Sequence, residues 1–415
     1  MKNLVILGAG TAGTMMANHL VKKLNKKDWQ ITLVDQFKSH YYQPGFLFIP
    51  FGTYQPEDVK RTIDEFLPKG IQLIREKIDR IDKDTDTVIL ENGRNVKYDI
   101  LIIATGCKIA PEEVPGMKGD TWQKNIFDFY TFEGSCALAK KLETWPGGKL
   151  VVHITEMPIK CPVAPLEFAF LADDYFTKKG MRDKVEISYV TPLSGAFTKE
   201  KCTKALEYLL KDKNIKIVPD FAVEHIEGEN GKMFDYGGEV VDFDLLVTVP
   251  TNMGDECILR SGFGDDLNYV PTDKNTLQSK VKENIFVIGD ATNVPASKAG
   301  SVAHFEAEIL TENILKYIEG KPLNPKFDGH ANCFIETGKG KALLIDFNYD
   351  VEPLKGKFPF AGIGPLNLLE ESAFNHFGKM AFKWVYWNML LPARKIPFVT
   401  PTMSRAGKKF DEVEG

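Results

Sequence analysis

The chain has 415 residues, of which 43% are hydrophobic and 26% are charged. This composition excludes a disordered or collagen-like chain, and the length predicts two or three domains. A net charge of −5 argues against a general nucleic-acid-binding protein, and six cysteines are too few for a disulfide scaffold. No signal-peptide pattern opens the chain, and no apolar run reaches the ~18 residues of a spanning helix. We therefore expect a cytoplasmic chain that meets a membrane, if at all, only peripherally.

The first 35 residues have the pattern of a strand, a glycine turn, a helix and a second strand. Apolar residues fill 4–7 and 31–34, and 14–24 has helical periodicity. Three glycines form a G-x-G-x-x-G pattern after the first strand: Gly8, Gly10 and Gly13. Such glycines let the backbone approach a pyrophosphate at a helix N-terminus. Asp35 ends the second strand and is expected to accept a hydrogen bond from a ribose hydroxyl.

Two later segments have the pattern of buried strands that end in small or acidic residues. One covers 99–103 and ends in Ala104, Thr105 and Gly106. The other covers 284–288 and ends in Gly289 and Asp290. Together with the glycine turn, and in this order, the motifs resemble those of the flavoproteins with two dinucleotide-binding domains.

That resemblance implies an α/β fold with two Rossmann-like domains and FAD as cofactor. The FAD-binding domain is then discontinuous, formed by 1–108 and 281–325, and a second domain, 109–280, is inserted into it. In the family, the aspartate that Asp290 matches binds the ribityl chain of FAD. A phenylalanine-rich C-terminal region, 326–415, follows. No metal site is expected.

The second domain lacks the glycine loop that a nicotinamide dinucleotide would need. A strand is expected at 149–154, but the segment after it, 155–165, contains no glycine and carries three prolines. Side chains occupy the place where a pyrophosphate needs bare backbone, and Glu156 adds a negative charge there. We therefore expect that NADH does not bind productively to this domain.

Cys161 lies in this altered loop, where a helix is expected to begin. Because a helix N-terminus and the neighbouring Lys160 both favour a thiolate, we expect the pKa of Cys161 to be low. Cys333 stands in the C-terminal region. The sequence around these two cysteines is similar to the sulfide:quinone oxidoreductases and the related flavocytochrome sulfide dehydrogenases.

This second resemblance implies a catalytic site. In the family, two cysteines corresponding to Cys161 and Cys333 form a redox pair at the flavin. Glu167 matches a glutamate proposed as an acid/base, and Lys298 matches a residue of the segment under the flavin. Many members carry a third cysteine just before the second domain, but 127–132 contains none. This difference favours a branch that uses two cysteines.

The resemblance also implies a quinone site and a membrane-docking end in the C-terminal region. Phe334 and Phe374 are the candidate rings around the quinone. A helix is expected up to Pro392, too short to span a bilayer, with Lys379 and Lys383 facing anionic headgroups. Its apolar stripe is expected to face the membrane and consists of Phe374, Phe377, Met380, Ala381, Trp384, Tyr386, Trp387 and Leu391.

The hypothesis is thus an enzyme that oxidises sulfide through Cys161 and Cys333 and passes electrons through FAD to a membrane quinone. It is expected as a peripheral protein on the cytoplasmic face of the membrane, with a homo-oligomer possible. One alternative is a flavoenzyme of the type II NADH:quinone oxidoreductase kind, which uses no cysteines. The other is a non-catalytic flavin-binding redox sensor.

Overall fold

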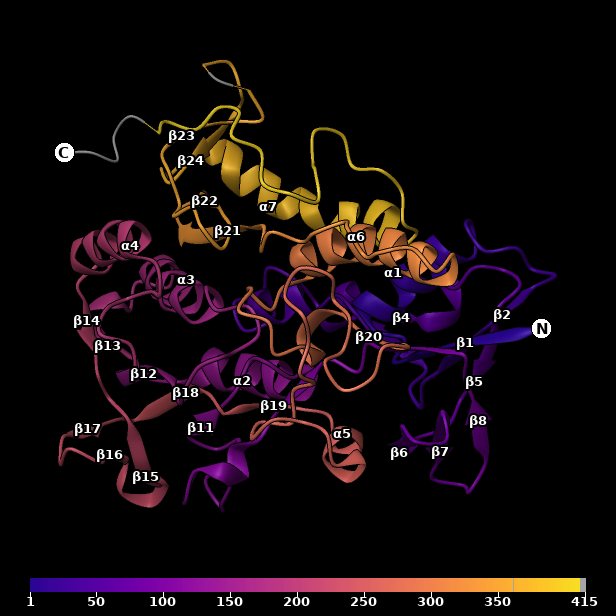
Figure 1. Ribbon diagram of the computed structural model, residues 1–415. Coiled ribbons are helices and arrows are strands. Elements are labelled where there is room, and N and C mark those ends of the chain that lie inside the picture. The colour runs from indigo at the N-terminus through magenta and orange to yellow at the C-terminus, as the bar shows by residue number, and fades with distance from the viewer. Residues whose placement is uncertain (361, 411–415) are drawn as a thin grey trace.

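A computed structural model describes residues 1–360 and 362–410 (Figure 1). Its first sheet is parallel, with the strand order β20-β9-β1-β2-β5. The strands are β1 (Lys2–Leu7), β2 (Trp29–Val34), β5 (Gln72–Ile74), β9 (Ile100–Ile103) and β20 (Ile285–Val287). Leu4–Leu7 are fully buried, because a central parallel strand is covered on both faces. Helices α1 (Thr11–Leu20) and α6 (Gly300–Ile318) pack against each other beside this sheet.

A second parallel sheet has the order β11-β18-β12-β13-β14. Its strands are β11 (Ile126–Phe127), β12 (Gly148–Ile154), β13 (Val185–Val190), β14 (Ile215–Val218) and β18 (Leu245–Val249). The helices of this part are α2 (Phe132–Thr144), α3 (Ala164–Lys178) and α4 (Glu200–Asp212). Two Rossmann-like sheets in an α/β fold confirm the predicted fold class, whereas the domain boundaries stay a prediction.

Smaller elements complete the two halves. Two short antiparallel sheets consist of β6 (Ile78–Asp82), β7 (Thr87–Leu90) and β8 (Asn95–Lys97), and of β15 (Val223–Glu227), β16 (Lys232–Asp235) and β17 (Val240–Asp242). Two strand pairs consist of β3 (Ser39–Tyr41) with β4 (Lys60–Thr62), and of β10 (Cys107–Ile109) with β19 (Asn252–Gly254). Helix α5 (Glu256–Ser261) follows β19.

The C-terminal region forms a sheet that the sequence analysis did not predict. Its order is β21-β22-β24-β23, from β21 (Ala331–Gly338), β22 (Lys341–Phe347), β23 (Gly356–Phe358) and β24 (Leu366–Leu368). Helix α7 (Ala373–Val385) packs on β22 and β21 and continues into a π-helical turn over Tyr386–Leu390. Strand β21 contacts both α3 and α6, so this region lies over both Rossmann-like halves (Figure 1).

The apolar stripe of the C-terminal helix is divided between surface and core. Phe374, Phe377 and Trp384 are exposed on one face of α7. The prediction that the rest of the stripe faces a membrane is wrong for Tyr386, Trp387 and Leu391. These three side chains are buried, because the π-helical turn carries them into the main hydrophobic cluster.

Within the described residues, no helix combines the length and the apolar character needed to cross a bilayer.

Candidate active site

The glycine turn after β1 has the tight geometry that its motif predicts. A side chain on Gly13 would lie 1.8 Å from the carbonyl oxygen of Gly8, and one on Gly8 would lie 2.5 Å from that of Ala104. Gly8 also has a φ of 94°, which favours glycine. Among the described residues, no atom outside the adjoining chain lies within 4 Å of the position that a side chain on Gly10 would take. The turn therefore leaves open space beside the N-terminus of α1.

The groups around this space fit a nucleotide cofactor. No side chain caps the N-terminus of α1, so its first N–H groups are available to an anion. Asp35 accepts a hydrogen bond from the Ala9 N–H at 2.6 Å, which holds its carboxylate beside the turn. The buried hydroxyl of Thr105 has no hydrogen-bond partner among the described residues. A Cβ added to Gly289, which follows β20, would lie 3.3 Å from the Cβ of Ala12.

Lys298 is held over the segment that follows β20. Its Nζ donates to the carbonyl oxygens of Asp290 at 3.0 Å and Thr292 at 2.6 Å, and it lies 4.0 Å from the centre of the Tyr269 ring. Burial lowers the pKa of Lys298, although the Asp290 carboxylate opposes this shift. Lys298 and Asp290 therefore form one cluster, and Gly106 ends the neighbouring strand segment after β9.

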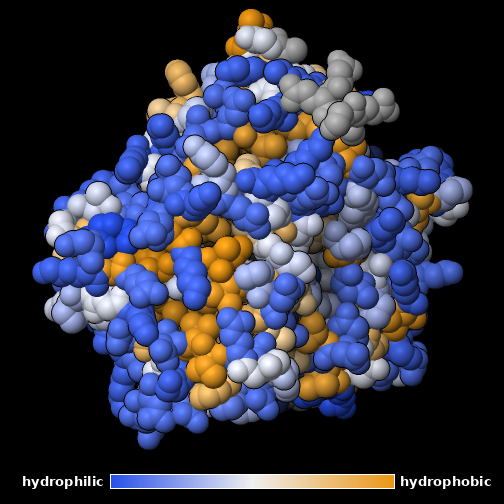
Figure 2. Space-filling view, turned by 90° about the vertical axis from the view of Figure 1, so that its left-hand side faces the viewer, coloured by the Kyte–Doolittle hydropathy of each residue, from blue (hydrophilic) through white to orange (hydrophobic). Residues whose placement is uncertain are grey.

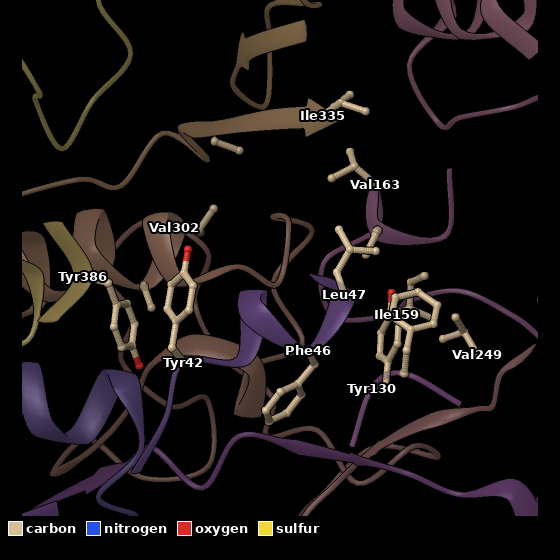
Figure 3. Packing of buried hydrophobic residues seen from close by; sticks show 14 of the residues in the cluster. Tyr42, Phe46, Leu47, Tyr130, Ile159, Val163, Val249, Val302, Ile335 and Tyr386 are labelled. Carbon is tan, nitrogen blue, oxygen red and sulfur yellow. The ribbon is translucent and has the colours of Figure 1, made fainter. Parts of the chain in front are cut away.

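The loop that replaces the second glycine motif is closed by its own side chains. Ile159 and Val163 are 1% exposed and lie in the main hydrophobic cluster (Figure 3). The Cys161 N–H donates to the Lys298 carbonyl oxygen at 2.7 Å, next to a parallel bridge between Lys160 and Lys298. The loop is thus attached to the segment that follows β20 of the first sheet, and it brings Cys161 beside Lys298.

Cys161 and Cys333 are brought together by this arrangement. Both thiols are free and partly buried. Burial raises the pKa of Cys161 to about 12, with a further contribution from Glu167. Burial also raises the pKa of Cys333, and the charge of Cys161 adds to that rise, which places the two sulfur atoms in one electrostatic environment.

The prediction of a low pKa for Cys161 is therefore wrong. Helix α3 begins at Ala164, and Cys161 precedes it in a left-handed turn with a φ of 48°. The cation that lowers the pKa of both Cys161 and Cys333 is Lys379, not Lys160.

Glu167 lies in the first turn of α3 and is fully buried. Its Oε1 accepts hydrogen bonds from Lys379 Nζ at 2.7 Å and from the Glu336 N–H at 2.8 Å. Lys379 Nζ also donates to the Phe334 carbonyl oxygen at 3.0 Å. Burial raises the pKa of Glu167, and the ammonium of Lys379 opposes that rise. The prediction that Lys379 faces headgroups is wrong, because its side chain points inward to this carboxylate.

A second buried acid, Glu336, lies between this ion pair and the surface. The Glu336 carboxylate is buried, and both its oxygens lie within 3.0 Å of His376 Nδ1. Burial raises the pKa of Glu336 to about 7, and the hydrogen bond with His376 opposes the shift. The His376 side chain is 36% exposed. Glu167 and Lys379 are thus connected through Glu336 to a histidine at the surface of α7.

Comparison with known proteins shows what this chain is similar to. Residues 2–152 match the profile of the family described as pyridine nucleotide-disulphide oxidoreductase. The mitochondrial sulfide:quinone oxidoreductase of Dictyostelium discoideum is 28% identical, over 94% of this chain and 86% of the relative. That of Mus musculus is 25% identical, over 93% and 86%. The solved sulfide:quinone oxidoreductase of Aquifex aeolicus superposes with a TM-score of 0.76 at 23% identity, covering 94% of this chain and 92% of that one.

Over more than nine-tenths of its length, the chain is similar to the sulfide:quinone oxidoreductases. It is accordingly a flavin-dependent oxidoreductase. The sequence analysis had assigned this family from its motifs, and the assignment is confirmed.

The two candidate quinone rings differ in their exposure. Phe334 is partly buried on β21, and its ring rests on Gly378 of α7, where an added Cβ would lie 2.8 Å from it. Phe374 is 64% exposed on the outer face of α7. Their role at a quinone stays a prediction.

Sequence reasoning missed Lys379 and Glu336 as parts of the site. On helix α7, the usual pattern of burial is reversed. The polar residues Asn375 and Lys379 are buried, whereas Phe374 and Phe377 are exposed. A helical pattern shows which residues share a face but not which face is covered. The spacing of Asn375 and Lys379, four residues apart opposite an apolar stripe, was the one available signal.

Proposed function

We propose that this chain oxidises hydrosulfide to sulfane sulfur and transfers the electrons through FAD to a membrane quinone. Support comes from the names of the family relatives and from the contacts of the two cysteines. The observation that carries the proposal is the cluster formed by Cys161, Cys333 and the Glu167–Lys379 ion pair beside Lys298. This cluster combines two sulfur atoms, a base and a cation in a largely buried place.

The chain offers groups for each part of FAD. The pyrophosphate would meet the N-terminus of α1 at Gly10, and Asp35 would bind a ribose hydroxyl. Asp290 would bind the ribityl chain, and Lys298 would supply positive charge near the ring system. When bound, FAD supplies an acceptor and donor of two electrons.

The two cysteines would supply the sulfur chemistry. Hydrosulfide attacks a Cys161–Cys333 disulfide, so that one S–S bond forms, one breaks, and the second cysteine leaves as a thiolate. Release of the sulfane sulfur and renewal of the disulfide require removal of two electrons. The sum is HS⁻ + quinone + H⁺ → S⁰ + quinol, in which sulfide is oxidised, the quinone is reduced and one proton is taken up.

Glu167 and Lys379 would control charge in this step. Because burial raises the pKa of both thiols, the cysteine that leaves takes up a proton at neutral pH, and a base must remove that proton before the disulfide is renewed. Glu167, which electrostatically affects both, is that base. The Lys379 ammonium lowers the pKa of both thiols and therefore favours the thiolate.

The outer surface of the C-terminal region would dock on the membrane. We call it the docking surface, and its exposed apolar side chains are Phe360, Ile363, Phe374, Phe377, Trp384 and Phe398. The ring centres of Phe360 and Phe398 lie 5.2 Å apart, so the two loops that carry these residues are in contact. Figure 2 shows hydrophobic residues at the end of the molecule where the C-terminal region lies. Aromatic side chains favour the bilayer interface, and exposed Arg394 and Lys395 could meet anionic headgroups.

Docking there would place the protein peripherally on the cytoplasmic face, with Phe334 and Phe374 near a quinone in the bilayer. A homo-oligomer is compatible with this arrangement.

The alternative of an NADH-oxidising quinone reductase is disfavoured by the closed loop 155–165. Its buried Ile159 and Val163 occupy the place of a glycine turn. A non-catalytic redox sensor would bind flavin without turnover.

Anaerobic stopped-flow absorbance tests the proposal. Sulfide should bleach the flavin of the purified protein, a short-chain quinone should restore its absorbance, and NADH should leave it oxidised. Fast bleaching by NADH with none by sulfide would overturn the proposal, and flavin that neither reagent reduces would favour the sensor.

A further inference from the structure

Tyr386 joins the C-terminal region to the glycine turn at the start of the chain. Its hydroxyl lies 2.7 Å from Thr11 Oγ1 and 2.7 Å from His40 Nε2. The side chain is 1% exposed, and its ring packs 5.0 Å from that of Tyr42 (Figure 3). A tyrosine hydroxyl that is buried needs such partners, and here all of them, including the Tyr41 carbonyl oxygen at 3.4 Å, come from the first 41 residues.

Thr11 occupies the point where two helix N-termini meet. It is the first residue of α1, directly after Gly10 and the open space beside it. Gly300 is the first residue of α6, and a side chain there would lie 3.9 Å from Thr11 Cγ2. Both helix ends carry partial positive charge, so an anionic group beside Thr11 is stabilised from two sides.

His40 is a neutral hydrogen-bond partner of the Tyr386 hydroxyl. Burial lowers the pKa of His40 to about 4, so the ring is neutral and one nitrogen carries a proton. Nδ1 has no partner among the described residues. The tautomer with the proton on Nε2 lets His40 donate to Tyr386 and Tyr386 donate to Thr11, and it leaves the Thr11 hydroxyl proton for an acceptor in the nucleotide space.

The same C-terminal segment is fastened at two more points. Lys22 Nζ, just beyond α1, donates to the carbonyl oxygens of Pro392 at 2.8 Å and Ala393 at 3.0 Å. The Trp387 ring stacks on Phe66 at 5.0 Å. Tyr386 is therefore held rigidly enough to orient a neighbouring hydroxyl.

We propose that Tyr386 is a positioning residue for FAD: it turns the Thr11 hydroxyl towards the pyrophosphate and so makes the C-terminal segment part of the cofactor site. This rests on the proposed function only in that the nucleotide is FAD. Because linkage is reciprocal, bound FAD in turn stabilises the seating of the segment that carries the docking surface.

The test measures release of FAD from the full-length holoenzyme after dilution, followed by the fluorescence of free flavin. Tyr386→Phe, which keeps the ring, and Thr11→Ala should each release FAD about tenfold faster, as expected for one hydrogen bond in a chain that ends on a charged group. The double variant should be no faster than either single, because both interrupt the same chain. Thr11→Ser should behave like the unchanged protein.

Tyr189→Phe is the matched control, since Tyr189 is a buried tyrosine of the second sheet whose hydroxyl donates to the Ala196 carbonyl oxygen at 3.4 Å. FAD release by Tyr386→Phe at the unchanged rate, or independent effects that multiply in the double variant, would overturn the inference. A protein that holds FAD but is not reduced by sulfide would contradict the proposed function and leave these rates as the test of Tyr386.

Discussion

The carboxylate of Glu167 and the ammonium of Lys379 form a buried ion pair at 2.7 Å, although 212 residues separate them in the chain. The pair connects α3 of the second Rossmann-like part to the inner face of α7. Through it, the helix that carries part of the docking surface also supplies a cation that lowers the pKa of both cysteines. Removal of either partner should therefore affect both stability and chemistry.

Lys379→Met should destabilise the protein strongly. It leaves the Glu167 carboxylate buried without its counter-ion, which typically costs about 3–5 kcal/mol. Glu167→Gln combined with Lys379→Met should recover much of this loss, because no unpaired charge remains. Urea unfolding measures both. Lys383→Met is the control, because Lys383 is 3.9 Å from a half-exposed Asp58 and such pairs contribute about 0–1 kcal/mol. Equal losses for Lys379→Met and Lys383→Met would contradict the role of the buried pair.

Glu167→Gln should slow flavin reduction by sulfide about 10²–10⁴-fold while FAD stays bound, since a positioned acid/base contributes about that much. The rate should also lose its dependence on pH in the range where Glu167 titrates. Asp174→Asn, on the same helix and paired with Lys178 at 2.7 Å, is the matched control and should react normally. A rate unchanged from about pH 6 to 9 in Glu167→Gln would return this residue to a structural role.

Glu306 should make stability depend on pH. It is buried on α6, accepts the Gly289 N–H at 2.7 Å, and burial raises its pKa from 4.5 to about 7. Between these pH values the folded state holds a proton that the unfolded state releases. The contribution of Glu306 to the free energy of unfolding is therefore fully present below about pH 4.5 and is lost as the pH rises to about 7. Glu306→Gln should remove that slope, worth roughly 3 kcal/mol at most between pH 5 and 8. Urea midpoints at the two pH values measure it, and an identical slope in both proteins would rule out Glu306 as its source.

Phe377→Ser should weaken binding to liposomes that contain anionic lipid by about tenfold or more. Removing one large apolar side chain from an interface loses about 1.5–3 kcal/mol. Phe377 is 71% exposed on the docking surface, and Tyr236, 75% exposed beyond β16, serves as control. In a flotation assay, Tyr236→Ser should float with the vesicles as the unchanged protein does. If both variants float equally well, membrane contact lies elsewhere.

Deleting the chain from residue 373 onward does not test docking cleanly. The buried Tyr386, Trp387 and Leu391 belong to the main cluster, and Lys379 neutralises Glu167. We therefore expect that truncation to disturb the flavin site. Single surface substitutions avoid the problem.

The sequence was most informative where geometry allows few residue types. Gly8 and Gly13 are dictated by backbone contacts that no side chain tolerates, so their motif predicted the fold of the first domain. The inward orientation of Lys379 could not be predicted, because it depends on a carboxylate 212 residues away. The raised pKa of Cys161 was missed for a similar reason. Its burial results from packing between distant segments, whereas local charge suggested the opposite shift.

The central claim is that Cys161 and Cys333 carry out the sulfur chemistry. Anaerobic stopped-flow reduction of bound flavin by sulfide tests it most directly in Cys161→Ser and Cys333→Ser, with Cys136→Ser as control because Cys136 is a partly exposed thiol on α2. The account predicts that each of the first two variants keeps FAD but loses most reduction, that the double variant is little worse, and that Cys136→Ser reacts normally. Full reduction by sulfide in Cys333→Ser would contradict it.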